Sequence, residues 1–187
     1  MKRRTGLFCA ALAMATAGPA FAEVNRFQKA LSDFSTLFSE QAVPREVVRY
    51  PSSHKPGTII VSTRERRLYY VLGNGQAVRY GVGVGRPGFT WGGTKAITRK
   101  AEWPSWTPPA QMLKRRPDLP RHMKGGPDNP LGARAMYLGS SLYRIHGSNE
   151  PWTIGQAVSS GCIRMTNEDV MDLYARVKVG THVVVQN

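Results

Sequence analysis

Cys162 has the neighbours that a catalytic cysteine requires, in the segment Ser159-Ser160-Gly161-Cys162-Ile163-Arg164. A cysteine nucleophile needs a base that makes the thiolate, a group that orients this base, and hydrogen-bond donors for the developing oxyanion. Gly161 permits a tight turn that could expose the thiol and leave backbone N–H groups free. Arg164 lies on the same side as Cys162 if the segment is extended, and a nearby cation lowers a thiol pKa or holds an anionic substrate group. The alternative for Cys162 alone is a small buried hydrophobic residue.

The base that would activate this thiol is expected to be a histidine, because histidine titrates near neutral pH. His146 ends an apolar strand-like segment, and the following Gly147 would let its side chain emerge at a site. Sixteen residues separate His146 from Cys162, which is enough for a loop that returns both to one place. A histidine at a strand end is also often structural, so the spacing is only suggestive. Three other histidines lie in an expected linker, a long loop and the last expected strand: His54, His122 and His182.

The segments around these two residues resemble the active-site signature of the L,D-transpeptidase catalytic-domain family. The signature is seen in His146-Gly147-Ser148, followed by Ser159-x-Gly161-Cys162-Ile163-Arg164-Met165. The similarity extends upstream to Gly126-Pro-Asp-Asn-Pro-Leu-Gly132 and Tyr137-Leu138, and it covers approximately residues 58–186. One position departs from the commonest pattern, since Ser160 stands where many members carry a histidine.

The resemblance implies a role for each residue of the signature. Cys162 would attack the amide carbonyl before the terminal D-alanine of a peptidoglycan stem tetrapeptide. His146 would take the thiol proton and later protonate the leaving amine, with the backbone carbonyl of Gly147 orienting its ring. The Cys162 N–H would contribute to the oxyanion hole. The other residues expected at the oxyanion hole or the substrate are Ser159, Ser160, Gly161 and Arg164.

Several aromatic residues are further candidates for the same site. An oxyanion-hole tyrosine has no firm match, and Tyr137 and Tyr143 are the candidates for it. Four tryptophans flank Gly- or Pro-rich turns and either line a substrate groove or pack under long loops: Trp91, Trp103, Trp106 and Trp152.

The secondary-structure pattern predicts a mainly β fold, a β-sandwich or barrel-like catalytic domain with one firm helix in its C-terminal half and a short N-terminal helix. Thr166 and Asp169 form a capping box that opens the firm helix at 167–177. Earlier in the chain, a short helix is predicted at 110–116 and a long Pro/Gly loop at 117–132, and such a loop is usually functional or a lid. Strands are predicted from β-branched and aromatic runs at 58–63, 67–72, 76–84, 94–102, 135–138, 143–146 and 181–186, with a tight turn at 73–75.

The chain divides into three expected parts. Residues 1–22 contain a basic start, an apolar run and Ala20-Phe21-Ala22, which together predict a cleaved signal peptide and export to the periplasm. Residues 23–57 are expected to form a helical segment at 24–40, with Phe27, Leu31, Phe34 and Phe38 on one face, and then an extended linker. Residues 58–187 are the expected catalytic domain.

The amino-acid composition and net charge limit the classes of protein and the kinds of partner that fit this chain. The 187 residues are 41% hydrophobic and 20% charged, which is typical of a globular chain. The net charge is +14, and removal of Lys2, Arg3 and Arg4 with the signal peptide lowers it to +11. Removal of Cys9 leaves one cysteine, and the histidines lack metal-ligand spacing, so we expect no disulfide, no metal and no cofactor. Dispersed basic residues on an exported chain favour a carboxylate-rich partner over nucleic acid. No stable membrane span is expected, because the apolar run is too short.

Three functions are compatible with these features. The first is a peptidoglycan L,D-transpeptidase whose acceptor is a diaminopimelate amine, a D-amino acid or a protein amine, and which reacts with carbapenems. The second is an L,D-carboxypeptidase or amidase that uses water as the acceptor. The third is a non-catalytic wall-binding protein, against which the joint presence of Cys162, His146 and Arg164 argues.

Overall fold

The computed structural model describes residue 29 and residues 43–187. The signal peptide predicted at 1–22 lies outside the described residues, as does the helix predicted at 24–40 apart from residue 29. Every structural statement below concerns the described part of the chain.

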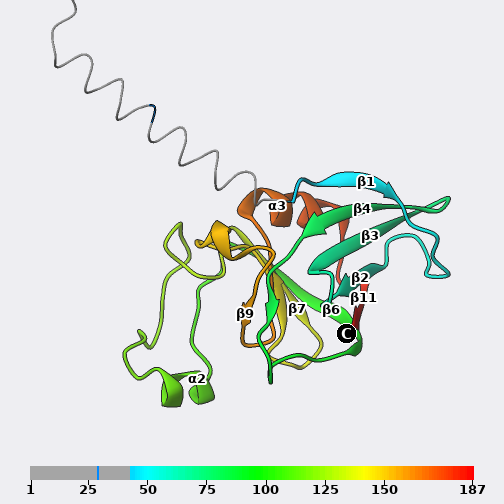
Figure 1. Cartoon of the computed structure of the whole chain (residues 1–187). Helices are drawn as coiled ribbons and strands as arrows, with labels where there is room; N and C mark the ends of the chain where they lie inside the picture. Colours follow the sequence, from blue (N-terminus) through cyan, green and yellow to red (C-terminus); the bar gives the residue numbers. More distant parts are fainter. Residues whose placement is uncertain (1–28, 30–42) are drawn as a thin grey trace, which may run out of the picture. The chain divides into compact units, whose positions relative to one another are not determined.

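Most of the regular structure in residues 43–187 is β-strand, as predicted (Figure 1). The strands of the main sheet are adjacent in the order β1-β4-β3-β2-β11-β6-β7-β8-β10, and β5 pairs with β9 separately. In chain order the strands are β1 (Glu46–Arg49), β2 (Ile59–Ser62), β3 (Arg67–Gly73), β4 (Gln76–Gly81), β5 (Val84–Gly85), β6 (Gly93–Glu102), β7 (Arg134–Leu138), β8 (Arg144–His146), β9 (Ala157–Ser159), β10 (Ile163–Arg164) and β11 (His182–Gln186). The helices are α2 (Ala110–Arg115), the 3₁₀ turn η1 (Pro151–Thr153) and α3 (Asn167–Arg176).

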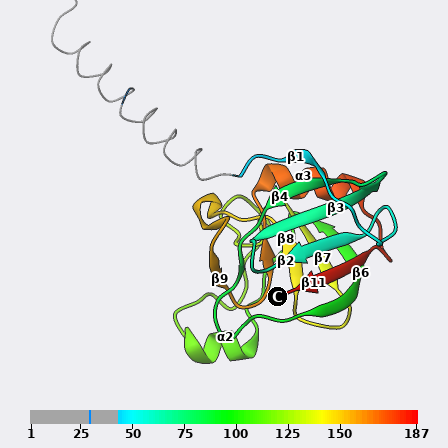
Figure 2. The same ribbon diagram turned by 45° about the vertical axis from the view of Figure 1, so that its right-hand side comes forward.

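The hairpin of β3 and β4 closes where the sequence predicts a tight turn. Asn74 and Gly75 both have positive φ, +50° and +70°, which is the backbone geometry that tight hairpin turns favour. The last strand, β11, lies within the sheet, parallel to β2 and antiparallel to β6. Figure 2 shows β4, β3, β2 and β11 side by side.

The extended linker expected after the helical segment in residues 23–57 is wrong for residues 46–49. These residues form β1, which pairs antiparallel with β4 at the edge of the sheet. The pairing rests on backbone hydrogen bonds, an ion pair between Glu46 and Arg79, and the stacking of Tyr50 on Tyr69 at 4.4 Å between ring centroids. Because an edge strand buries few side chains, its sequence lacks the apolar alternation that reveals a strand.

The hydrophobic core joins the sheet to α3. Thr166 caps this helix by accepting a hydrogen bond from the Asp169 N–H at 3.1 Å, as the capping box predicts. Val170 and Leu173 of α3 are fully buried. They pack in one cluster with strand residues that include Ile59, Leu68, Tyr80, Ile97, Met136, Ile145 and Ile163. The core therefore holds β8 and β10 rigidly from one side.

The long connection from β6 to β7 leaves the sheet and carries α2 (Figure 1). It spans the loop predicted at 117–132, and the buried Asn129 side chain orders it by accepting from the Leu131 N–H and donating to the Lys124 carbonyl. Within the described residues no helix is long and apolar enough to cross a membrane.

Candidate active site

Two neighbouring parallel strands bring the predicted cysteine and histidine together. In the β8–β10 ladder, Ile163 lies beside Ile145, and Arg164 lies beside His146. Both isoleucines are buried in the core. Because side chains alternate along a strand, His146 and Arg164 point to the opposite face of the sheet, as do Arg144 and Cys162, one residue before each isoleucine.

His146 is held as a neutral imidazole with one defined tautomer. Its Nδ1 lies 2.6 Å from the carbonyl oxygen of Gly147, the group that the sequence analysis expected to orient it. A carbonyl can only accept, so Nδ1 carries the proton and Nε2 keeps a lone pair. Burial, aided by the charges of Arg164 and Arg144, lowers the pKa of His146 to about 3. His146 as a whole residue is 5% exposed, and its neutral imidazole can serve as a base at neutral pH.

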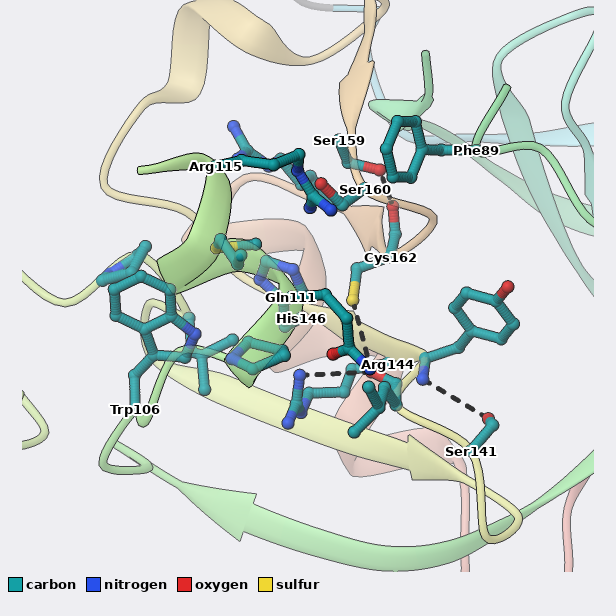
Figure 3. A pocket seen from close by; sticks show the side chains of 17 residues that line it. Phe89, Trp106, Gln111, Arg115, Ser141, Arg144, His146, Ser159, Ser160 and Cys162 are labelled. Atoms are coloured by element: carbon teal, nitrogen blue, oxygen red, sulfur yellow. Dashed lines mark hydrogen bonds between the residues drawn. The ribbon is translucent and has the colours of Figure 1, made fainter. Parts of the chain in front are cut away.

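The Cys162 thiol is also neutral in the resting structure. Its Sγ lies 3.7 Å from the carbonyl oxygen of Leu142, to which the S–H donates (Figure 3). Burial raises the pKa of the thiol, while the charges of Arg144 and Arg164 act in the opposite direction. Thiol and imidazole therefore face the same space as an uncharged pair rather than as a preformed ion pair.

The turn before Cys162 is fixed by Ser159 and Gly161. The Ser159 hydroxyl accepts from the Gly161 N–H at 3.1 Å and donates to the Cys162 carbonyl at 2.6 Å. Gly161 has φ +106°, and a Cβ there would lie 2.5 Å from a ring carbon of Tyr143. Trp91 completes the support, because its indole N–H donates to the Gly161 carbonyl at 2.7 Å and its ring stacks on Tyr143 at 4.4 Å.

This turn separates the backbone donors that the sequence analysis grouped as oxyanion candidates. The Gly161 N–H is already bonded to Ser159, so it is not free in this conformation. The Cys162 N–H has no hydrogen-bond partner within residues 43–187. An N–H directly on the nucleophilic residue is a favourable oxyanion donor. The Ser160 side chain lines the cavity beside it.

Arg164 lines the cavity but is engaged by an acidic partner. Its Nη1 lies 2.9 Å from Glu150 Oε2 and 3.5 Å from the Thr153 hydroxyl. The arginine side chain is 22% exposed, so the pair is partly shielded from water. Glu150 therefore already pairs with the guanidinium that the sequence analysis expected either to lower the thiol pKa or to hold an anionic substrate group.

A cavity of about 480 Å³ opens over the cysteine and histidine. The sheet side supplies Tyr143, Arg144, His146 and Cys162, and the β6–β7 connection supplies Trp106, Met112, Arg115, Pro130 and Leu131. Figure 3 shows Trp106, Arg115, Arg144, His146 and Cys162 around the cavity. Phe89 closes one side and contacts Arg115 at 5.1 Å between ring centroid and guanidinium carbon. The volume and the mixture of apolar walls with a few polar groups suit a small peptide.

The remaining candidates divide between the cavity and the surface. Of the four tryptophans, Trp106 lines the cavity, Trp91 supports the turn, and Trp103 and Trp152 are exposed. Tyr143 lines the cavity, whereas Tyr137 stacks with Arg144. The other three histidines lie outside the cavity, at His54, His122 and His182. No group of three His, Cys, Asp or Glu side chains in residue 29 or residues 43–187 could hold a metal ion.

Arg144 is a charged cavity residue next to the nucleophile that sequence reasoning missed. It precedes His146 by two positions, so strand alternation places it on the same face as the histidine. That periodicity was a usable signal in the sequence, because residues 144–146 were predicted as part of a strand. Attention to the signature residues alone leaves it unnoticed.

The fold and this Cys–His site are those of a known family. The sequence model of the L,D-transpeptidase catalytic domain matches residues 56–185, a range that includes the whole cavity. The chain belongs to the L,D-transpeptidase catalytic domain family, which confirms the family predicted from the signature.

Individual relatives agree with this membership. "Probable L,D-transpeptidase ErfK/SrfK" of Escherichia coli (strain K12) is 38% identical over 154 residues, which cover 78% of this chain and 48% of that protein. The chain thus spans about half the length of the curated relatives it matches.

Solved structures share the fold. L,D-transpeptidase 3 from Mycobacterium tuberculosis, in complex with a faropenem-derived adduct, has a TM-score of 0.54 at 19% identity, covering 70% of this chain and 60% of that one. At that identity the likeness concerns the fold alone. A Brucella melitensis structure titled "Probable carnitine operon oxidoreductase caia" is 46% identical with a TM-score of 0.52, covering 77% and 94%. That name belongs to the Brucella melitensis protein, and the family of this chain rests on the match over residues 56–185.

Proposed function

We propose that this chain is a periplasmic L,D-transpeptidase that uses Cys162 as a nucleophile on peptidoglycan stem peptides. The observation that carries the proposal is the meeting of a thiol and a neutral imidazole, with a lone pair on Nε2, in one cavity. Such a pair suits acyl transfer, since the imidazole can accept the thiol proton and later return it to a leaving amine. Family membership supports the substrate class.

In the first half-reaction the amide before the terminal D-alanine is cleaved. Sγ of Cys162 attacks the carbonyl carbon, and the thiol proton passes to Nε2 of His146. The carbonyl oxygen becomes an oxyanion that the Cys162 N–H stabilises. The C–N bond then breaks, and the His146 imidazolium gives its proton to the departing amine. D-alanine is released, and the rest of the peptide stays bound to Cys162 as a thioester.

In the second half-reaction an amine takes the acyl group. The amine attacks the thioester carbonyl while Nε2 of His146 accepts its proton. A new amide bond forms as the C–S bond breaks, and the His146 imidazolium returns the proton to the departing sulfur. A diaminopimelate amine would give a cross-link, a D-amino acid would give exchange, and a protein amine would give wall anchoring. Water as acceptor would make the chain an L,D-carboxypeptidase or amidase instead.

The supporting residues act on geometry in this proposal. Ser159 and Gly161 hold the turn that presents the thiol, Gly147 fixes the imidazole tautomer, and Arg164 braces the site through Glu150. Ser160 lines the cavity where substrate would pass. A net charge of +11 after loss of residues 1–22 suits a carboxylate-rich wall polymer.

Incubating the protein with purified muropeptides and measuring product masses tests the reaction and its acceptor together. A dimer lacking one D-alanine supports transpeptidation, and a trimmed monomer alone supports the hydrolytic alternative. Cys162→Ala should abolish both products, whereas His122→Gln, at an exposed position outside the cavity, should retain them. Products formed equally by Cys162→Ala would sink the proposal.

The same variants test reaction with β-lactams. The Mycobacterium tuberculosis enzyme of similar fold carries a faropenem-derived adduct, and we expect carbapenems to acylate Cys162 here. Covalent labelling retained in Cys162→Ala would contradict this expectation. No labelling of either protein would favour a wall-binding role without catalysis.

A further inference from the structure

A row of side chains crosses the sheet and ends at the nucleophile. Arg99 of β6 pairs with Tyr137 of β7, and Tyr137 pairs with Arg144 of β8. The guanidinium carbons of Arg99 and Arg144 lie 3.5 and 5.2 Å from the centroid of the Tyr137 ring. Cation–π contact with this ring holds Arg144 in place. The next strand in the sheet begins directly after Cys162.

Arg144 and the thiol share one acceptor. The carbonyl oxygen of Leu142 accepts from Nη1 of Arg144 at 3.2 Å and from the Cys162 thiol at 3.7 Å (Figure 3). When the thiol loses its proton, the sulfur stops being a donor and becomes an anionic acceptor. The guanidinium beside it then has a negative charge to face.

Arg144 also has a donor with nothing to bind. Its Nε is buried and has no hydrogen-bond partner within the described residues. Leaving a buried donor unpaired is costly, so the unpaired Nε of Arg144 calls for an explanation. No carboxylate within residues 43–187 forms an ion pair with Arg144.

The other cations near the thiol are less suited to balance a thiolate. Arg164 is already neutralised by Glu150. Burial and two arginines disfavour the charged form of His146. The titratable and charged side chains that line the cavity around Cys162 come from β8, β10, α2 and the loop before β8, and they are Arg144, His146, Arg164, Arg115 and Tyr143.

We infer that Arg144, braced by Tyr137, is the cation that stabilises the Cys162 thiolate. The inference rests on the proposed function, because it assigns a counter-charge to the nucleophile named there. It requires no other reactant: the thiol proton leaves, and the sulfur anion gains a guanidinium neighbour.

The test is the pH dependence of Cys162 alkylation by iodoacetamide, a neutral reagent, in the full chain. Peptide masses distinguish the adduct at Cys162 from any at Cys9. Arg144→Gln should move the midpoint of the rate profile upward by about one pH unit, which makes alkylation at pH 7 roughly tenfold slower. Arg144→Lys retains the charge and should recover most of the lost rate.

Arg99→Gln is the matched control, since it removes the same charge from an exposed position on β6, which β7 and β8 separate from β10. It should change the rate by less than about twofold, because solvent screens that charge. An unchanged midpoint in folded Arg144→Gln, with folding checked by circular dichroism, would overturn the inference. An equal shift in Arg99→Gln would do the same.

Acyl transfer by the unmodified protein separates the two claims. If muropeptides are processed but the midpoint of the alkylation profile is the same in Arg144→Gln as in the wild type, only the role of Arg144 is refuted. If the midpoint depends on Arg144 but no acyl transfer is found, the thiolate assignment stands and the proposed function fails.

Discussion

His146 shows how a buried residue can be ready for catalysis and yet weaken the fold in acid. Its imidazole stays neutral because burial and the nearby arginines lower its pKa to about 3. The unfolded chain has an ordinary histidine with a pKa near 6.5. At pH values between these two pKa values, His146 is protonated in the unfolded chain but neutral in the folded chain. Stability contributed by His146 is therefore complete above about pH 6.5 and is lost as the pH falls toward 3.

Replacing His146 by glutamine should remove this acid sensitivity. We expect the wild type to lose on the order of 2–3 kcal/mol of unfolding free energy between pH 7 and pH 4.5 through His146 alone. The His146→Gln variant should lose less by that amount. Urea denaturation at both pH values measures the difference. His182→Gln, at an exposed position of β11, should retain the wild-type pH dependence, and identical curves for His146→Gln would refute the explanation.

At the scale of the element, the turn from β9 to β10 carries the geometry of the site. Gly161 combines a positive φ with close contact to Tyr143, while Ser159 ties both ends of the turn. The turn presents the thiol because these contacts allow one backbone path. A substitution that distorts this turn should therefore reduce the reactivity of the Cys162 thiol as well as the stability of the fold.

Gly161→Ala should be more harmful than an alanine at a comparable glycine. Gly180 also has a positive φ, +91°, but an added Cβ there would meet nothing within 4 Å. We expect Gly180→Ala to cost about 1 kcal/mol through backbone strain and to leave the acylation rate unchanged. Gly161→Ala should cost roughly 2–4 kcal/mol and slow acylation at least tenfold, because strain and a clash with Tyr143 add. If Gly161→Ala and Gly180→Ala changed the unfolding free energy and the acylation rate by equal amounts, the clash with Tyr143 would be unimportant.

The elements also show what sequence patterns can predict. The strands with buried, β-branched residues, the capped helix α3 and the turn at Asn74 and Gly75 follow from local patterns. The edge strand β1 does not, because backbone pairing holds it with little burial. The pairing of the Gly161 N–H with Ser159 was also beyond the sequence, since it depends on the exact path of the turn.

At the scale of the whole molecule, the sheet and the connection between β6 and β7, residues 103–133, form opposite walls of the cavity. The sheet fixes Arg144, His146, Cys162 and Arg164 from a rigid core, and this connection supplies the opposite wall of the cavity. The signature in the sequence identified the cysteine and histidine, but not the wall. From the sequence, Trp106 is compatible with either a groove or packing, and the 117–132 loop, which contains Leu131, has only a general functional role. Local spacing does not show which side chains reach the cavity in the folded chain.

The central claim is that Cys162 takes the acyl group from a stem tetrapeptide. Mass spectrometry of the intact protein, quenched in acid after brief mixing with a tetrapeptide that ends in D-alanine, tests it most directly. The account predicts a mass increase equal to the tetrapeptide less D-alanine, located on Cys162 and absent from Cys162→Ala. An adduct of the same mass on Cys162→Ala, or no adduct on a wild-type protein whose Cys162 is alkylated readily, would contradict it.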